Sequence, residues 1–330
     1  MKIGPFLSMQ NPNQTNGHEP EFQVEGEIVY SAEIREPSGP KQVKHSRRFV
    51  VARKGQQWKI WTANLDKDDR FAYGNDYNEM GCDGAKIFEL KSFDENNPRL
   101  SSVADIITAQ GRLGLGDAPA GFDLDFIYPL WLAYCSSNHF LSRQDNRIAA
   151  PLFIIGDSFL DVVPPTLSLP AKWKLNDSNF ISEIAWHSEG QELGVENGTS
   201  RLQYRLHTLP PPFDSGFLRA SFETSDWVDF NGMRLPGVFA VKTFFPNQTT
   251  GRCDASYAIE AKVQAAHPLQ NFSFVPELTK KTRITDTRYR LCYPCSGHPT
   301  YASLTWMTEA EVEAKNKSLG IKYEKQSTQG

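Results

Sequence analysis

Hydrophobic and polar residues alternate with a period of two over residues 22–34. Apolar residues or glycine occupy every even position, from Phe22 through Ile28 to Ile34, while most odd positions are charged or polar. Successive side chains of a β-strand point to opposite faces of the sheet. The pattern therefore predicts one long strand with a single buried face, ended by the turn-forming residues 35–41.

Residues 46–64 and 70–93 each predict two further strands that are joined by a short turn. We place these turns at Lys54-Gly55-Gln56 and at Cys82-Asp83-Gly84. Neighbouring strands that are connected by so few residues must run antiparallel. The first hundred residues therefore predict an antiparallel meander.

An aromatic segment then interrupts the strand pattern. Phe126, Leu130 and Tyr134 recur at a spacing of four residues, which places them on one side of an α-helix. We predict a central helix near residues 123–142, and a helix with so many aromatic residues must cover an apolar surface.

Strand patterns resume after this helix. Asn231-Gly232 predicts a hairpin turn, and residues 256–265 again alternate between apolar and polar positions. Near the C-terminal end, Thr308 and Glu311 have the spacing of a capping box, which predicts the start of a short polar helix.

Together these elements predict a mainly β (α+β) fold, in which one large curled antiparallel sheet, a half-barrel, packs around the central helix. We expect a disordered segment at residues 1–21, a single half-barrel domain at 22–307, and a polar helix with a frayed tail at 308–330. Two smaller separate β domains are the alternative architecture.

Composition narrows the possible partners. The formal net charge of −4 leaves no excess of Lys and Arg to neutralise phosphates, so we expect no nucleic-acid partner. No run of about 18 apolar residues occurs, so we expect no transmembrane segment. As written, the chain predicts a cytoplasmic location, and a periplasmic or extracytoplasmic one if an upstream signal peptide is missing. Localisation and oligomeric state stay open.

Residues 153–161 read FIIGDSFLD and match the first block of the GDSL esterases, in which the serine is the nucleophile. The block lies at mid-chain here, and no histidine has an aspartate three residues before it. Without a base that a carboxylate holds in place, Ser158 keeps the weak nucleophilicity of an ordinary serine. We therefore expect a short strand that ends in a turn at Gly156-Asp157-Ser158, and no enzyme. An esterase that uses Ser158 is the alternative.

Cys292, Cys295 and His298 lie within seven residues and are candidate metal ligands or, for the two cysteines, a redox pair. Gly297 and Pro299 prevent the following helix that a redox pair needs, and a zinc site needs a fourth ligand that the sequence does not offer. We expect a local disulfide or two reduced thiols, no metal and no cofactor.

Aromatic residues make up 12% of the chain, which is more than an ordinary core requires. Most of them must form the core between sheet and helix, but a curled sheet this aromatic also favours a cavity for an acyl chain or another hydrophobic ligand. The candidate ligand-binding residues come from the strands and the central helix: Phe49, Trp58, Trp61, Tyr73, Phe88, Trp131, Trp227, Phe239 and Phe244.

Three stretches resemble the half-barrels of LolA/LppX-like proteins: RRFVVARKGQQWKIW (47–61), YNEMGCDGAKIFELKSFD (77–94) and the hairpin SDWVDFNGMRLPGVFAV (225–241). The resemblance lies in the pattern of turns and strands. It implies an antiparallel half-barrel with a helical lid that carries a lipid or a lipoprotein, normally in the bacterial periplasm. This chain is longer than a typical carrier of that kind and offers one clear lid helix, so the fold can carry over without the sorting role.

Three functions follow from this sequence. The first is a non-enzymatic binding or carrier protein for a hydrophobic small molecule, a lipid or a lipidated protein. The second is the esterase that uses Ser158, and the third is a structural or interaction module of a surface assembly.

Overall fold

The computed structural model describes residues 19–36, 39–64, 75–93, 109–116, 119, 126–151, 168–197, 202–269, 272–279 and 282–326. Its N-terminal strands are β1 (Glu21–Glu36), β2 (Gly39–Lys54), β3 (Gln57–Asn64), β4 (Asn75–Cys82), β5 (Lys86–Phe93) and β6 (Ala109–Leu115). Helices α1 (Ile127–Tyr134) and α2 (Ser137–Ser142) follow. Residues 1–18 of the expected disordered segment lie outside the described part of the chain.

The second half of the chain is again rich in strands. It contains β7 (Arg147–Ala149), β8 (Ser168–Leu175), β9 (Ile181–His187), β10 (Gln191–Asn197), β11 (Leu202–Thr208), β12 (Leu218–Phe230), β13 (Met233–Asn247) and β14 (Arg252–His267). The C-terminal part contains β15 (Thr282–Asp286), β16 (Tyr289–Leu291), β17 (Thr300–Ala302), α3 (Glu309–Ser318) and β18 (Tyr323–Lys325).

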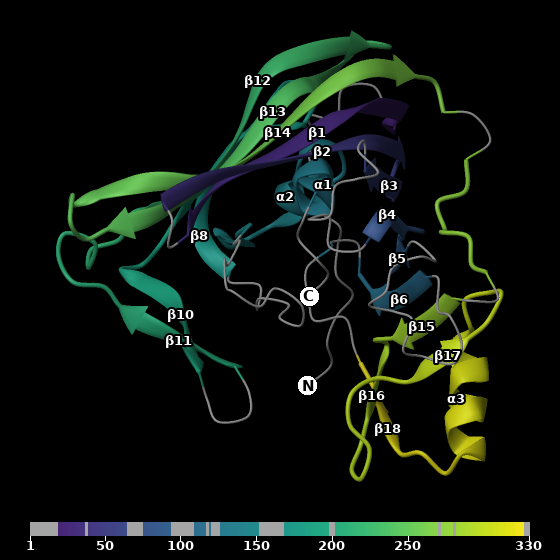
Figure 1. The fold of residues 1–330 in the computed structure, drawn as a ribbon. Helices are drawn as coiled ribbons and strands as arrows, with labels where there is room; N and C mark the ends of the chain where they lie inside the picture. The colour runs from purple at the N-terminus through teal and green to yellow at the C-terminus, as the bar shows by residue number, and fades with distance from the viewer. Residues whose placement is uncertain are drawn as a thin grey trace, which may run out of the picture.

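One open sheet of 14 strands dominates the described structure, in the order β17-β15-β6-β5-β4-β3-β2-β1-β14-β13-β12-β9-β8-β7. It arches over α1 and α2 and does not close on itself (Figure 1). The predicted mainly β fold with a large curled sheet around a central helix is therefore confirmed. The chain joins its two β-rich halves by pairing β1 with β14.

The alternating pattern correctly identifies the buried face of β1. Phe22, Val24 and Ile28 are fully buried, as the period of two predicts. The predicted hairpins are also present, because β2 pairs with β3 and β4 pairs with β5 in antiparallel register. At the β12–β13 turn, Asn231 and Gly232 both have positive φ values, 49° and 79°, as a two-residue type I′ turn requires.

Two expectations about these elements need correction. The sheet is not wholly antiparallel, because β15 pairs in parallel with β6 after the long excursion of the chain through β7–β14. The central helix is two short helices that are interrupted at Cys135 and Ser136. Arg53 Nη1 donates to the carbonyl of Tyr134 at 2.8 Å. In a continuous helix this carbonyl would accept a hydrogen bond from the backbone N–H four residues later.

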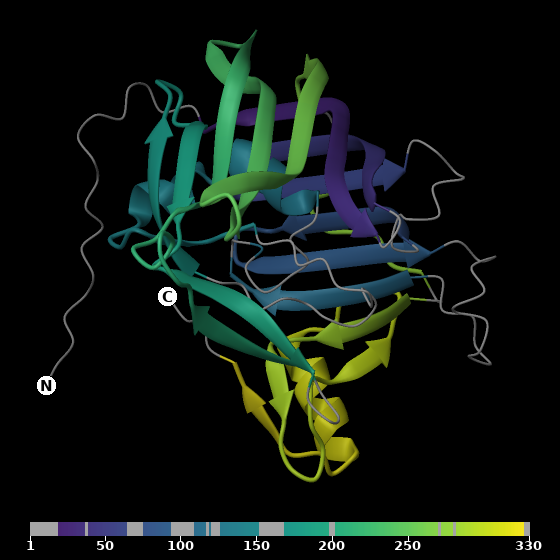
Figure 2. The same cartoon turned by 60° about the vertical axis from the view of Figure 1, so that its left-hand side comes forward.

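The C-terminal lobe, residues 282–326, continues beyond β6 at one end of the sheet (Figure 2). The capping box at Thr308 and Glu311 is present at the start of α3. The tail that the sequence predicts to be frayed includes β18, which pairs with β16. A small second core of buried residues holds the lobe together: Ile284, Tyr289, Tyr301 and Val312.

No helix in the described ranges is both long and apolar enough to cross a lipid bilayer.

Candidate functional site

Helix α1 occupies the concave side of the sheet. All eight of its residues are buried, and its Tyr134 ring packs between two strand aromatics, 6.5 Å from Phe49 and 5.9 Å from Phe239 between ring centroids. Four of the nine predicted ligand-binding residues belong to this core: Phe49, Trp58, Trp131 and Phe239. Trp131 belongs to the helix and the other three to the strands of the same core cluster, so their rings contribute to the protein's own core.

The other predicted residues lie elsewhere. Trp61 stacks on Tyr77 with ring centroids 5.9 Å apart, and it alternates with the core residue Ile60, so it faces away from α1. Trp227 is half-buried at the margin of the core, and Phe244 is half-buried on β13. Tyr73 lies outside the described residues. The structure does not bring the eight described aromatic residues together around one cavity.

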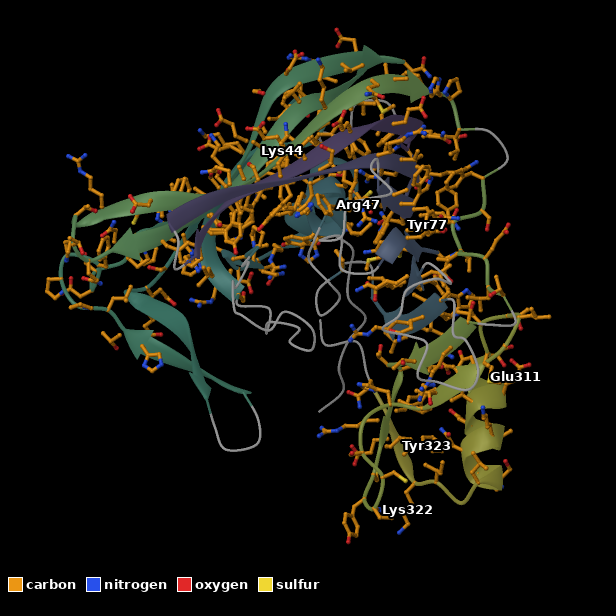
Figure 3. All side chains as sticks on the ribbon, viewed as in Figure 1. Lys44, Arg47, Tyr77, Glu311, Lys322 and Tyr323 are labelled. Atoms are coloured by element: carbon orange, nitrogen blue, oxygen red, sulfur yellow. The ribbon has the colours of Figure 1, made fainter. Side chains whose placement is uncertain are left out.

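The concave side also carries polar groups near one end of α1. The guanidinium of Arg47 lies 5.4 Å from the ring centroid of Phe126, and its Nη2 donates to the carbonyl of Thr62 at 3.3 Å. Figure 3 shows Arg47 below the sheet beside the helices. Cation–π contact and a backbone hydrogen bond together explain how an arginine can be 95% buried here.

A different surface of the sheet carries a pocket. Residues 272–279, which we call the covering segment, cross the outer face of β4 so closely that a Cβ atom on Gly81 would lie 2.0 Å from the carbonyl oxygen of Phe274. Trp306 of the C-terminal lobe donates its Nε1 hydrogen to the carbonyl of Pro276 at 3.2 Å. The covering segment and the lobe together form a roof over the outer face of β5 and β6.

The outer pocket lies under this roof and has a volume of about 670 Å³. Its apolar wall consists of Phe88, Leu113, Val275, Pro276, Leu278, Leu304, Trp306 and Met307, and its polar wall of Lys86, Ser273, Glu277, Arg288, Thr305, Thr308 and Glu309. Volumes of about 300–1,000 Å³ with mainly apolar walls are typical of sites for small molecules. Phe88 is the predicted ligand-binding residue that lines it, and it packs against Trp306 at 5.1 Å between centroids.

A buried ion pair stands at the wall of the outer pocket. Arg288 donates from Nε and Nη2 to the two oxygens of Asp286, at 3.0 and 2.7 Å, and from Nη2 to the carbonyl of Met307 at 2.7 Å. Burial by itself lowers the pKa of Arg288, but the hydrogen bonds and the charge of Asp286 outweigh it, so the pKa is raised. The guanidinium is therefore a permanent cation in this wall.

The remaining sequence candidates do not assemble a catalytic or metal site in the described structure. Ser158 lies outside the described residues. Cys292 and Cys295 are both free thiols, and His298 Nδ1 lies 2.7 Å from the carbonyl of Tyr289. Across the described ranges, no three or more Asp, Glu, His or Cys side chains lie close enough to hold a metal ion.

Sequence reasoning missed most of the outer pocket, because its walls come from the covering segment and the C-terminal lobe. One signal was available: Leu304, Trp306 and Met307 form a short apolar cluster just before a polar helix. Alternation along single strands cannot show which distant segment covers their outer face.

Comparisons with known proteins give a limited result. No family model matches the chain, and no curated protein matches it. Among solved structures, a LolA superfamily protein from Nitrosomonas europaea is similar over 78% of this chain and 91% of that chain, with 11% identity and a TM-score of 0.35. A DUF1329 family protein from Desulfovibrio piger is similar over 76% and 87%, with 9% identity and a TM-score of 0.27. The predicted weak resemblance to LolA-type proteins is confirmed as a distant similarity to solved structures. It carries no information about a ligand.

Proposed function

We propose that this protein is a non-enzymatic binding or carrier protein for a hydrophobic ligand, such as a lipid, an acyl chain or the lipid group of a modified protein. The observation that carries the proposal is the outer pocket, whose half-buried apolar wall combines Val275 and Leu278 of the covering segment with Trp306 and Met307 of the lobe. Burial of apolar surface of this kind is the main source of affinity for such ligands.

The proposal places the ligand in the outer pocket instead of on the aromatic concave face. Helix α1 fills that face with side chains that are buried on every side. A ligand there would have to displace Tyr134, whose hydroxyl donates to the carbonyl of Pro236 at 2.7 Å, and would lose the core contacts of the helix. The outer pocket needs no such displacement.

Two measurements test the binding function. Native mass spectrometry after mild purification should show the chain together with a bound amphiphile, and a fluorescent fatty acid should bind in titration. Finding only the mass of the bare chain, together with no uptake of the fatty acid, would contradict the proposal.

A pocket-filling variant tests the position of the ligand. Val275 is half-buried and lines the pocket, so Val275→Trp should occupy part of the volume and weaken fatty-acid binding by about tenfold or more, since it excludes the chain from its site. Leu319→Trp is the matched control, because Leu319 is 61% exposed and does not line the pocket. Equal weakening by both variants, or by neither, would place the ligand elsewhere.

A further inference from the structure

The outer pocket contains a buried arginine that neighbouring residues hold in place. Arg288 donates hydrogen bonds from Nε and Nη2 to Asp286 and Met307. Within the described residues its Nη1 has no hydrogen-bond partner. The side chain is only 2% exposed and nevertheless lines the pocket. A cationic donor that its neighbours hold in place in the lining of a mainly apolar pocket is an anchor point for a polar group of the ligand.

Lys86 is a second cation in the lining of the pocket. Lys86, at the start of β5, lines the pocket and is half-buried, and no described residue forms an ion pair with it. Both cations act on the carboxylate of Glu309. Its pKa is lowered chiefly by its hydrogen bond to Lys325 and further by the charges of Arg288 and Lys86. Both cations are therefore within electrostatic range of one carboxylate in the pocket wall.

The lining contains two cations, Lys86 and Arg288, and two carboxylates, Glu277 and Glu309. Arg288 forms an ion pair with Asp286, and Glu309 forms one with Lys325. Lys86 is the lining cation without an ion pair among the described residues. Glu277, the other acidic residue of the lining, is exposed at the rim, where water screens its charge. The capping box engages the backbone N–H groups of Thr308 and Glu311, so we assign no role to the start of α3.

We infer that the outer pocket binds an amphiphile with a single anionic head group, a long-chain carboxylate, whose head lies against Arg288 and Lys86 and whose chain lies along Val275, Leu278 and Trp306. A carboxylate offers two oxygens to donors such as Arg288 and Lys86, and its single charge suits Lys86, which forms no ion pair with a described residue. This inference rests on the proposed function and adds the chemical class of the ligand.

The test compares ligands that share one chain and differ in the head group. Isothermal titration calorimetry below the micelle concentration would use tetradecanoate, tetradecan-1-ol and tetradecanoyl lysophosphatidylcholine. We expect tetradecanoate to bind about tenfold more tightly than the neutral alcohol, since a charge-assisted hydrogen bond distinguishes them. The zwitterionic lipid should bind less tightly than the acid.

Variants then assign the difference to the two cations. Lys86→Met keeps the length of the side chain without its charge, so it should weaken tetradecanoate binding by about three- to tenfold and leave the alcohol unchanged. Replacing Arg288 alone would leave Asp286 buried without a partner, so the second variant is Asp286→Asn/Arg288→Met, which removes both charges. It should also reduce the preference for the acid. Circular dichroism checks that both variants fold.

Lys172→Met is the matched control, because Lys172 is an exposed lysine of β8, near the opposite edge of the sheet. It should leave the ratio of the affinities for acid and alcohol unchanged. Equal affinity for acid and alcohol, or a preference that survives in both pocket variants, would overturn the head-group assignment and leave the proposed function standing. Tighter binding of the zwitterionic lipid would likewise overturn the assignment. Binding of none of the three amphiphiles would overturn the proposed function itself.

Discussion

Thr62 and Thr282 are two buried threonines of the large sheet, and their hydroxyl groups have different surroundings. Each is 1% exposed. Thr282 Oγ1 accepts from the backbone N–H of Thr279 at 3.0 Å and lies 3.1 Å from its hydroxyl, while Thr62 Oγ1 has no partner in the described part of the chain. A buried hydroxyl without a partner destabilises the fold, and a satisfied one stabilises it.

We therefore expect Thr62→Val and Thr282→Val to change stability in opposite directions. Thr62→Val removes an unpartnered hydroxyl and should raise the free energy of unfolding by up to about 1 kcal/mol. Thr282→Val removes the hydroxyl that accepts from the amide of Thr279 and should lower it by about 1 kcal/mol. Urea titration followed by circular dichroism measures both, and a loss of stability in Thr62→Val as large as that in Thr282→Val would contradict the assignment.

Cysteine accessibility gives a second test at single residues. Burial raises the pKa of the Cys135 thiol to about 12, despite the opposing charge of Arg53, whereas Cys295 is exposed in a loop. Because the thiolate is the reactive form, Ellman's reagent at pH 8 should modify Cys295 in the folded protein and Cys135 only after unfolding. Cys295→Ser should remove the fast phase, and an unchanged fast phase would show that another thiol reacts first.

The same thiol predicts the direction of a pH effect. The unfolded chain ionises Cys135 near pH 9, and the folded chain holds its proton to about pH 12. Its contribution to stability is therefore fully present below pH 9 and is lost as the pH rises through this window. Cys135→Ala should unfold with a weaker dependence on alkaline pH than the parent chain, as measured by thermal unfolding between pH 8 and 11.

Between elements, Arg53 links strand β2 to both helices of the concave side. Its Nη1 donates to the carbonyl of Tyr134 and to the hydroxyl of Ser137, each at 2.8 Å, and its Nε donates to the carbonyl of Gly55 at 3.1 Å. Burial lowers the pKa of Arg53, and the charges of Cys135 and Glu19 oppose this. The side chain thus satisfies the backbone at the point where α1 ends.

Arg53→Met should lower the free energy of unfolding by about 2–4 kcal/mol, because it leaves three buried acceptors without their donor. Lys54→Met is the control on the next residue, where the side chain is 56% exposed and its ion pair with Glu21 is at the surface. We expect a change below about 0.5 kcal/mol there. Similar losses in the two variants would show that the buried hydrogen bonds of Arg53 contribute little.

The contact between β4 and the covering segment depends on a single glycine. A side chain at Gly81 would collide with the backbone of Phe274, and backbone cannot move aside as the end of a flexible side chain can. Gly81→Ala should therefore lift the covering segment from the sheet, lower stability by about 1–3 kcal/mol and weaken fatty-acid binding. Gly232→Asn is the control, because there is open space around this turn and asparagine is among the side chains that best tolerate its positive φ. Unchanged binding and stability in Gly81→Ala would mean that the covering segment is not held at this position.

At the scale of the whole molecule, the C-terminal lobe protects one end of the sheet. Strand β15 pairs with the free edge of β6, and Trp306 covers Phe88, which is 5% exposed. An uncovered strand edge beside an exposed aromatic face is a site of aggregation. We propose, as the sequence indicates, that residues 22–307 fold as one domain. We also propose that the C-terminal lobe, which begins within this domain and ends beyond it, is required for a soluble fold.

Truncation tests this dependence. A chain that ends at residue 279 should elute from size-exclusion chromatography as aggregates or fail to remain soluble, because β6 and Phe88 lose their cover. A chain that ends at residue 326 keeps every described element and should elute as the parent chain does. A stable truncated chain with unchanged elution would show that the lobe is a separate addition to the fold.

Local patterns in the sequence determined the strands, their buried faces and the short turns. The alternation around Phe22 and Ile28, the turn at Asn231-Gly232 and the capping box at Thr308 are each decided by neighbours within a few residues, so a single sequence displays them. The helical character of the aromatic segment follows from the same kind of pattern. These features are confirmed in the structure because side-chain direction and turn geometry are local properties.

Only the tertiary structure decided which surfaces remain open. From the sequence, Phe49, Trp58 and Phe239 could be either core residues or ligand contacts. They are core residues because α1 occupies the side of the sheet that they face. The outer pocket forms because residues more than 150 positions apart along the chain, such as Phe88 and Trp306, meet across the sheet. The break between α1 and α2, where Arg53 binds the carbonyl of Tyr134, is likewise a contact between distant residues. The hydrophobic effect is not directional. Composition therefore shows that apolar surface will be buried, and only the packing of the folded chain shows which segments bury it.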